Sequence, residues 1–258
     1  MKIIKFKKDD LVGYGQLLDQ KVKVFETYPW IDDAFNGQIL DLHELNLLAP
    51  CDPSKIVGLA INFHGSTGSS EDMKEPLVFI KPSSSLIGPD EDIVSPFKDI
   101  NIWGECELAI VIGSLLKNAS LEEVKKSIFG YSIGNDVTAD NINNWDHHLA
   151  RSKGCDSFCV IGPWIDTDFI PDDQIISGYH NDQLIRRGFL NERIFKEPNF
   201  LVELSKWLTL YPGDVILTGA PNRTRDRMYF SDGDSYSCVI EGLGKISNNF
   251  RTSIKVEI

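Results

Sequence analysis

The chain has 258 residues, which is enough to bury a sizeable core as one large domain or as a large domain with a small appendage. Its hydrophobic fraction of 42% is that of an ordinary soluble protein, and its net charge of −12 argues against a nucleic-acid partner, because an acidic surface repels phosphate. No apolar run reaches the roughly 20 residues that span a bilayer, and the N-terminus does not have the pattern of a signal peptide. We therefore expect a cytoplasmic protein with no membrane partner, and the five irregularly spaced cysteines predict free thiols.

The first fifty residues differ in character from the rest. We expect them to form a small N-terminal element, 1–50, that precedes a main domain, 51–258. The element contains a strand candidate over 22–25 and a helical-looking segment over 39–50. Two prolines mark the expected boundary, Pro50 and Pro53.

Beyond this boundary, short apolar runs alternate with turn signals, which is typical of a β-rich protein. A terminal hairpin is expected over 235–250, around Gly242 and Gly244. Five further strands are expected, at 55–63, 76–82, 107–113, 131–137 and 215–219.

Two helices are expected within this part of the chain. Over 120–131, Ser120 forms the N-cap, Glu123 completes a capping box and Gly130 ends the helix. The segment 139–152 also has a helical appearance.

A third, amphipathic helix is expected over 197–210, with a proline in its first turn. Its apolar face consists of Phe200, Leu201, Leu204, Trp207 and Leu208. Strands outnumber helices along the whole chain, so the predicted class is α+β and β-rich, and not a doubly wound sheet.

The sharpest local pattern is a pair of glutamates, Glu105 and Glu107, in the segment WGECELA. Side chains alternate along a strand, so both point to one face, where like charges are unfavourable without a positive partner. Asp136, at the end of another apolar strand, offers a third carboxylate. Three oxygen ligands suit a hard cation, Mg²⁺ or Mn²⁺, with Ca²⁺ as an alternative, and leave positions open for a 2-oxo acid. A solvated strand face is the other interpretation of the same spacing.

From about residue 55 to 249, the chain resembles the fumarylacetoacetate hydrolase family. Its segments occur in the family's order: KIVGLAINF, PLVFIKPSSSLIGP, GECELAIVIG, GYSIGNDVTA, KGCDSFCVIGPW, LTLYPGDVILTGAP and IEGLGKISN. The resemblance implies a mixed β-sandwich or roll with a few peripheral helices, assembled as a homodimer. It also implies a small 2-oxo or diketo acid as substrate and a metal-bound enolate as the shared intermediate.

The family's metal ligands fall on the three carboxylates named above. Lys153 matches the family's lysine that supports the enolate, where a cation would stabilise charge that develops only in the transition state. Thr218 would offer its hydroxyl and nearby backbone N–H groups to a substrate carboxylate, or else is a buried strand-end residue. The candidate substrate-binding residues are Lys81, Thr218, Gly219 and Asn62, and Lys81 could instead pair with a carboxylate of the site.

The water-activating pair of the family's hydrolases is altered in this chain. The family places a His four residues after the position of Asn62 and a Glu three residues later, and those positions here are Ser66 and Ser69. His64 comes two residues early, and Glu71 comes two residues late. Either a glycine-rich loop re-aims His64, with Glu71, as the catalytic base, or the pair is missing and His64 is a polar loop residue.

Two further segments depart from the family pattern. An arginine that the family has after Thr138 and Ala139 is replaced by Asp140. Three arginines follow the LTGAP motif and either restore positive charge near an anionic substrate or belong to a solvated loop; they are Arg223, Arg225 and Arg227. The adjacent His147 and His148 would point apart on a helix, so we expect them at the surface.

The leading hypothesis is a Mg²⁺- or Mn²⁺-dependent hydrolase that cleaves a C–C bond in an acylpyruvate or diketo acid. The nearest alternative is an oxo-acid decarboxylase, isomerase or dehydratase of the same family, which needs no hydrolytic water. A different class is a non-catalytic paralogue that binds a metal and a small acid.

Overall fold

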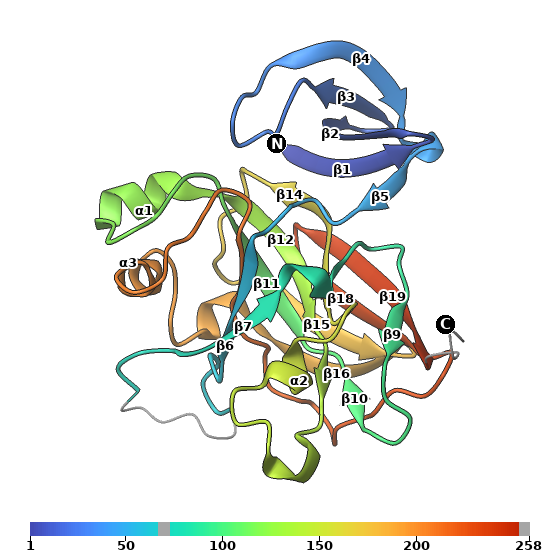
Figure 1. Ribbon diagram of the computed structural model, residues 1–258, viewed down its shortest axis with the longest axis vertical. Helices are drawn as coiled ribbons and strands as arrows, with labels where there is room; N and C mark the ends of the chain where they lie inside the picture. Colours follow the sequence, from blue (N-terminus) through green and yellow to red (C-terminus); the bar gives the residue numbers. More distant parts are fainter. Residues whose placement is uncertain (67–72, 253–258) are drawn as a thin grey trace.

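The computed structural model describes residues 1–66 and 73–252, and it is strand-rich with a few peripheral helices (Figure 1). This confirms the α+β, β-rich class expected from the sequence. The α-helices are α1 (Leu121–Ser127), α2 (Ala150–Lys153) and α3 (Asn199–Ser205). Short 3-10 turns cover Leu42–Glu44, Ser83–Ser85, Ile142–Asn144 and Leu190–Glu192. Among the described residues, no helix has the length and apolar composition needed to cross a bilayer.

The largest sheet runs through the whole molecule. Its strands are, in spatial order, β4 (Phe35–Asp41), β3 (Lys21–Phe25), β2 (Leu11–Leu18), β1 (Lys2–Lys8), β14 (Cys159–Asp166), β12 (Ile128–Asp136), β11 (Cys106–Ile112), β17 (Val215–Leu217), β6 (Lys55–Ala60) and β7 (Leu77–Pro82). Two short strands pair at its side, β5 (Asn46–Leu48) with β1 and β8 (Leu86–Ile87) with β14.

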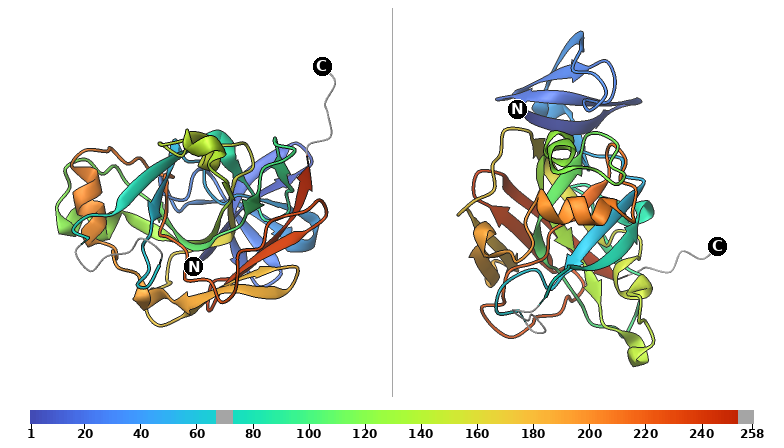
Figure 2. Two further views of the ribbon diagram at one scale, coloured as in Figure 1. Left: turned by 90° about the horizontal axis from the view of Figure 1, so that it is seen from below. Right: turned by 90° about the vertical axis from the view of Figure 1, so that its left-hand side faces the viewer.

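A second sheet packs against the middle of the first. It has the order β16 (Gln183–Phe189), β15 (Ile175–His180), β18 (Ser235–Ile240), β19 (Gly244–Thr252) and β9 (Ile93–Ser95). A two-stranded ladder joins β10 (Ile102–Trp103) to β13 (Thr138–Ala139). In the end-on view of Figure 2, the strands of the main body curve around a common centre, which gives the rolled sandwich expected.

The core lies between the two sheets and explains why β11 is apolar apart from Glu107. Every residue of Cys106–Ile112 is buried, because β11 has β12 and β17 as neighbours and the second sheet across its face. One face of this strand, including Leu108 and Ile110, packs with Cys238 and Ile240 of β18. All five cysteines are free thiols.

The first fifty residues contain five strands and no α-helix, so the helix expected over 39–50 is wrong. Strand β4 continues to Asp41 and β5 covers Asn46–Leu48, with a single 3-10 turn between them. Leu40, Leu45 and Leu47 pack around the buried Phe6, and this burial against the small sheet overrides the local helical preference. These strands lie at one end of the molecule, at the top of Figure 1.

The expected helix at 120–131 forms with its capping box but is shorter than predicted. The Ser120 hydroxyl accepts from the backbone N–H of Glu123, and the Glu123 carboxylate accepts from the N–H of Ser120 at 2.8 Å. The helix ends at Ser127 and not at Gly130, because Ile128 already pairs with β11.

The helix expected over 139–152 is wrong for most of its length. Only Ala150–Lys153 is α-helical, and Asn143, Asn144 and Leu149 have positive φ. Polar side chains hold the segment in turns instead, since the Asn141 side chain accepts from the N–H of Asp146 at 2.9 Å.

The third expected helix forms over Asn199–Ser205, beside α1 in Figure 1. Its buried face includes Phe200, Leu201 and Leu204, as expected. The prediction that Trp207 belongs to this face is wrong, because Trp207 lies beyond the helix and is 64% exposed.

Candidate active site

The three carboxylates converge where the β11–β12 ladder ends. Cys106 pairs with Asn135 and Glu107 with Gly134, so the residues before β11 and at the end of β12 lie side by side. Asp136 donates its backbone N–H to the Glu105 carbonyl at 2.9 Å. Carboxylate oxygens of Glu105, Glu107 and Asp136 all lie within 4.8 Å of one another.

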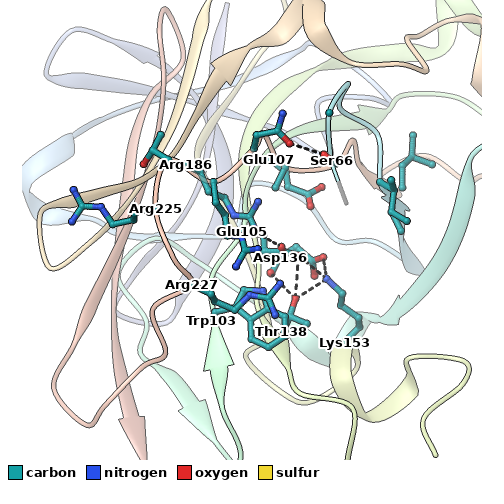
Figure 3. Close-up of a pocket in the computed structure, with 18 of the residues that line it drawn as sticks. Ser66, Trp103, Glu105, Glu107, Asp136, Thr138, Lys153, Arg186, Arg225 and Arg227 are labelled. Carbon is teal, nitrogen blue, oxygen red and sulfur yellow. Dashed lines mark hydrogen bonds and ion pairs between the residues drawn. The ribbon is translucent and has the colours of Figure 1, made fainter. Parts of the chain in front are cut away.

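These carboxylates form the floor of a pocket of about 800 Å³ (Figure 3). Lys153, from the end of α2, and Thr138, from β13, line the floor beside them. One wall comes from the segment after β17 and includes Asn222 and three arginines. Ser66 reaches the pocket from the loop after β6, and its hydroxyl donates to the Asn222 side chain at 2.9 Å.

Three cations surround the carboxylates. The Lys81 Nζ, fully buried on β7, lies 2.5 Å from one Asp136 oxygen. The Lys153 Nζ donates to the other Asp136 oxygen, to Glu105 at 3.1 Å and to the Thr138 hydroxyl at 2.6 Å. An Arg186 nitrogen lies 2.5 Å from Glu105. The three positive side chains therefore pair with Glu105 and Asp136, and none of the three pairs with Glu107.

The two glutamates differ in electrostatic environment. Burial, with the nearby Asp136 carboxylate, holds the pKa of Glu107 well above its usual value. Burial alone would also raise the pKa of Glu105, but the charges of Lys153 and Arg186 outweigh it and lower that pKa to about 2. Burial would lower the pKa of Lys153, yet Asp136 and Glu105 raise it, so this ammonium stays protonated.

The donor set fits a divalent cation. Two of the carboxylates, Glu107 and Asp136, are almost fully buried. The charge of Asp136 disfavours ionisation of Glu107, and a cation between the two carboxylates would offset this repulsion. All three offer hard oxygen ligands, the type that Mg²⁺, Mn²⁺ and Ca²⁺ prefer. Among the residues that the structure describes, this is the group with metal-ligand geometry.

Gly219 helps to fix Glu107. Its backbone N–H donates to a Glu107 oxygen at 2.6 Å. The residue has φ of +87°, and a Cβ there would lie 2.8 Å from the Cβ of Asn62, so only glycine fits without strain.

Two of the residues that we expect to contact substrate use their side chains in hydrogen bonds to backbone groups. The Thr218 hydroxyl donates to the Leu108 carbonyl at 2.9 Å. The Asn62 amide donates to the carbonyls of Thr218 and Phe195 and accepts from the Phe195 N–H, which ties the β6 loop to the end of β17. In this arrangement the two side chains support the pocket from behind, and neither lines it.

The expected base pair is only partly described. Glu71 lies outside the described residues. The His64 side chain is exposed and does not line the pocket, although Gly65 and Ser66 do. Its backbone carbonyl accepts from the Asn222 amide at 2.7 Å, so the loop that carries His64 borders the pocket.

Arg186 is a site residue that the sequence did not reveal. It lies on β16, far along the chain from Glu105, and also donates to the Pro221 carbonyl at 2.7 Å. The family's arginine after Ala139 is absent here, and Arg186 supplies a cation at the site from another strand. The only signal available was its place in the run LIRRGF, which resembles an ordinary exposed strand.

Comparison with known proteins identifies related sequences and folds. The family model "Fumarylacetoacetate (FAA) hydrolase C-terminal" matches residues 55–251, and a model of the Rv2993c-like N-terminal region matches 1–50. Protein Rv2993c of Mycobacterium tuberculosis is 33% identical over 241 residues, covering 91% of this chain and 89% of that protein.

Two more similar proteins carry activities in their names. An oxaloacetate tautomerase of Xenopus laevis, fahd2, is 33% identical over 229 residues, covering 83% of this chain and 70% of that protein. The structure of a 5-carboxymethyl-2-hydroxymuconate delta-isomerase from Mycobacterium smegmatis superimposes with a TM-score of 0.89 at 32% identity, covering 98% of this chain and 100% of that one.

Proposed function

This chain belongs to the fumarylacetoacetate hydrolase family, and from that premise we propose that it is a divalent-metal-dependent enzyme that moves a proton beside the keto group of a small 2-oxo acid. The reaction would be a keto–enol tautomerisation or a double-bond isomerisation. Relatives in this family are named as isomerases, tautomerases and hydrolases, so proton transfer is one of several activities that the fold accommodates.

The observation that carries this proposal is the composition of the pocket. Its described lining places a carboxylate trio beside a protonated lysine and includes no histidine. Hydrolysis needs a base that activates water for attack on a carbonyl carbon. Keto–enol exchange needs stabilisation of the charge that develops on the keto oxygen, and the proton would pass between the α-carbon and water in the pocket.

Glu105, Glu107 and Asp136 would hold the cation. A bound divalent cation would act as a Lewis acid that polarises the keto group of the substrate. Lys153 would exchange one of its three present partners for the substrate oxygen and stabilise the negative charge there. Lys81, fully buried against Asp136, would fix that carboxylate and would not contact substrate.

Hydrolysis of an acylpyruvate is the second candidate. It is favoured by the loop that bears His64, which borders the pocket through Gly65 and Ser66. In that case His64, with Glu71, would act as the base.

One experiment separates the two candidates. The purified protein, with Mg²⁺ or Mn²⁺, is given the enol form of oxaloacetate in one assay and an acylpyruvate in another, and both are followed by ultraviolet absorbance. We expect faster ketonisation of the enol, lost on chelation, and about 10²–10³-fold slower in Lys153→Met. Acylpyruvate cleavage that His64→Ala abolishes would favour the hydrolase instead, and inactivity on both substrates with any cation would contradict the proposal.

The resemblance to the family gives two further predictions. We predict a homodimer, which sedimentation would test. We also predict a preference among Mg²⁺, Mn²⁺ and Ca²⁺, which calorimetric titration of the metal-free protein would measure.

A further inference from the structure

The pocket has more positive charge than its carboxylate floor requires. When all three carboxylates are ionised to hold a divalent cation, the charges of Lys81, Lys153 and Arg186 equal theirs, so the two charges of the cation would be left uncompensated. A monocarboxylic oxo acid compensates one of these charges, and a dicarboxylic acid compensates both. Charge balance at the floor therefore favours a dianion before the wall is considered.

The wall adds three arginines and one carboxylate, Asp226, on a segment fixed at both ends. Near its start, the Thr224 N–H donates to the Ile185 carbonyl of β16 at 2.8 Å. At its far end, the Phe230 N–H donates to the Ile102 carbonyl of β10, also at 2.8 Å. The segment thus crosses from the second sheet to the β10–β13 ladder along the pocket, and it carries Arg223, Arg225 and Arg227.

Arg227 differs from the other two in its surroundings. Its guanidinium carbon lies 3.8 Å from the centroid of the Trp103 ring, and Trp103 is itself buried (Figure 3). The Arg227 Nε is buried and has no hydrogen-bond partner among residues 1–66 and 73–252. Arg225, by contrast, is exposed and donates to the Gln183 side chain at 3.0 Å. No carboxylate in the described part of the chain pairs with any of the three arginines.

A planar guanidinium on an aromatic face is fixed in orientation and leaves its edge free for a carboxylate. Because the Nε is covered by protein atoms, a ligand carboxylate would accept from the terminal nitrogens of this guanidinium, which lines the pocket. Trp103 and Glu105 are two residues apart on one segment, so this guanidinium lies beside the metal-binding floor.

We infer that Arg227, held against Trp103, binds the second carboxylate of a 2-oxo dicarboxylic acid and selects diacids over monocarboxylic oxo acids. This inference rests on the proposed function, because it takes the floor as the site of the 2-oxo acid group. It assigns the substrate class and the residue that recognises it.

The test is a calorimetric binding series with the full chain and Mg²⁺. The probes are pyruvate and 2-oxobutyrate, which lack a second carboxylate, and oxaloacetate and 2-oxoglutarate, which have one. The proteins are wild type, Arg227→Gln, Arg227→Lys and Arg225→Gln as the matched control. Because pyruvate contacts only the floor, unchanged pyruvate affinity in a variant shows that the site is still folded.

In wild type, we expect the diacids to bind at least about tenfold more tightly than the monocarboxylic acids, as charge-assisted hydrogen bonds allow. Arg227→Gln should reduce this ratio to near one without changing pyruvate affinity. Arg227→Lys should restore part of the ratio, and Arg225→Gln should retain most of it.

Each other outcome has a defined meaning. A ratio that survives Arg227→Gln, or a wild type without preference, overturns the inference. If no oxo acid binds in the presence of any divalent cation, the proposed function fails and the inference fails with it. If the affinity ratio of diacids to monocarboxylic acids changes as expected but no proton transfer is detected, the role of Arg227 in recognition is supported and the proposed reaction is wrong.

Discussion

Glu107 and Asp136 are buried side by side, and this makes the carboxylate cluster sensitive to pH. Burial and the neighbouring charge raise the pKa of Glu107 in the folded protein above its value in the unfolded chain. A neutral Glu107 is therefore favoured in the absence of a cation, and an ionised one is required to bind it.

The first prediction concerns the metal-free protein. Because the folded pKa of Glu107 is raised, its contribution to stability is complete below the unfolded glutamate pKa and is lost as pH rises through the raised value. The free energy of unfolding, measured in urea with a chelator from about pH 5 to about pH 8, should fall more steeply in wild type than in Glu107→Gln. Equal slopes in the two proteins would show that Glu107 ionises normally.

The second prediction concerns Arg186, which pairs with Glu105 at 2.5 Å. Arg186→Gln removes a charge that orients the proposed ligand Glu105, so affinity for Mn²⁺ should fall about 10–100-fold, as for other partners of metal ligands. The matched control is Arg187→Gln, the exposed neighbour on the same strand. Calorimetry that gives both variants wild-type affinity would remove Arg186 from the site.

At the scale of the elements, the carboxylate cluster could be predicted because it depends on local rules. Glu105 and Glu107 share a face by strand alternation, and β11 and β12 form where apolar runs predict them. Arg186 could not be predicted, because it reaches Glu105 through the packing of two sheets and not through sequence proximity. The expected helix at 139–152 failed for a different, local reason, since Asn141 and Asp146 side chains there bond to backbone groups that a helix would need.

The third prediction concerns Gly219, which follows β17 and donates its backbone N–H to Glu107. Gly219→Ala should cost about 1–2 kcal/mol for the left-handed backbone, and a further 1–3 kcal/mol for crowding against Asn62. Gly233 has the same φ of +87° with open space around it, so Gly233→Ala should show only the backbone cost. Urea unfolding measures both, and equal losses would mean that the contact with Asn62 relaxes freely.

At the scale of the whole molecule, charge is distributed unevenly. The chain has a net charge of −12, yet Arg223 and Arg225 are exposed on the wall of the pocket and form no ion pair with a described residue. The acidic composition of the whole chain gave no sign of this cationic rim. The arginine run was visible in the sequence, and only the fold places it over the carboxylates.

The fourth prediction follows from that rim. An anionic acid approaching an acidic protein is repelled in general and attracted only near the pocket, so its association rate should depend on the local charge. Stopped-flow binding of oxaloacetate should slow as ionic strength rises from about 0.02 to about 0.2 M, because salt screens exposed charges. The double variant Arg223→Gln, Arg225→Gln should bind more slowly at low salt and show a flatter dependence. Lys245→Gln, on β19 outside the pocket, removes one positive charge elsewhere and should leave the slope unchanged. If it flattens the slope as much as the double variant does, then net charge and not the rim governs the approach of the substrate.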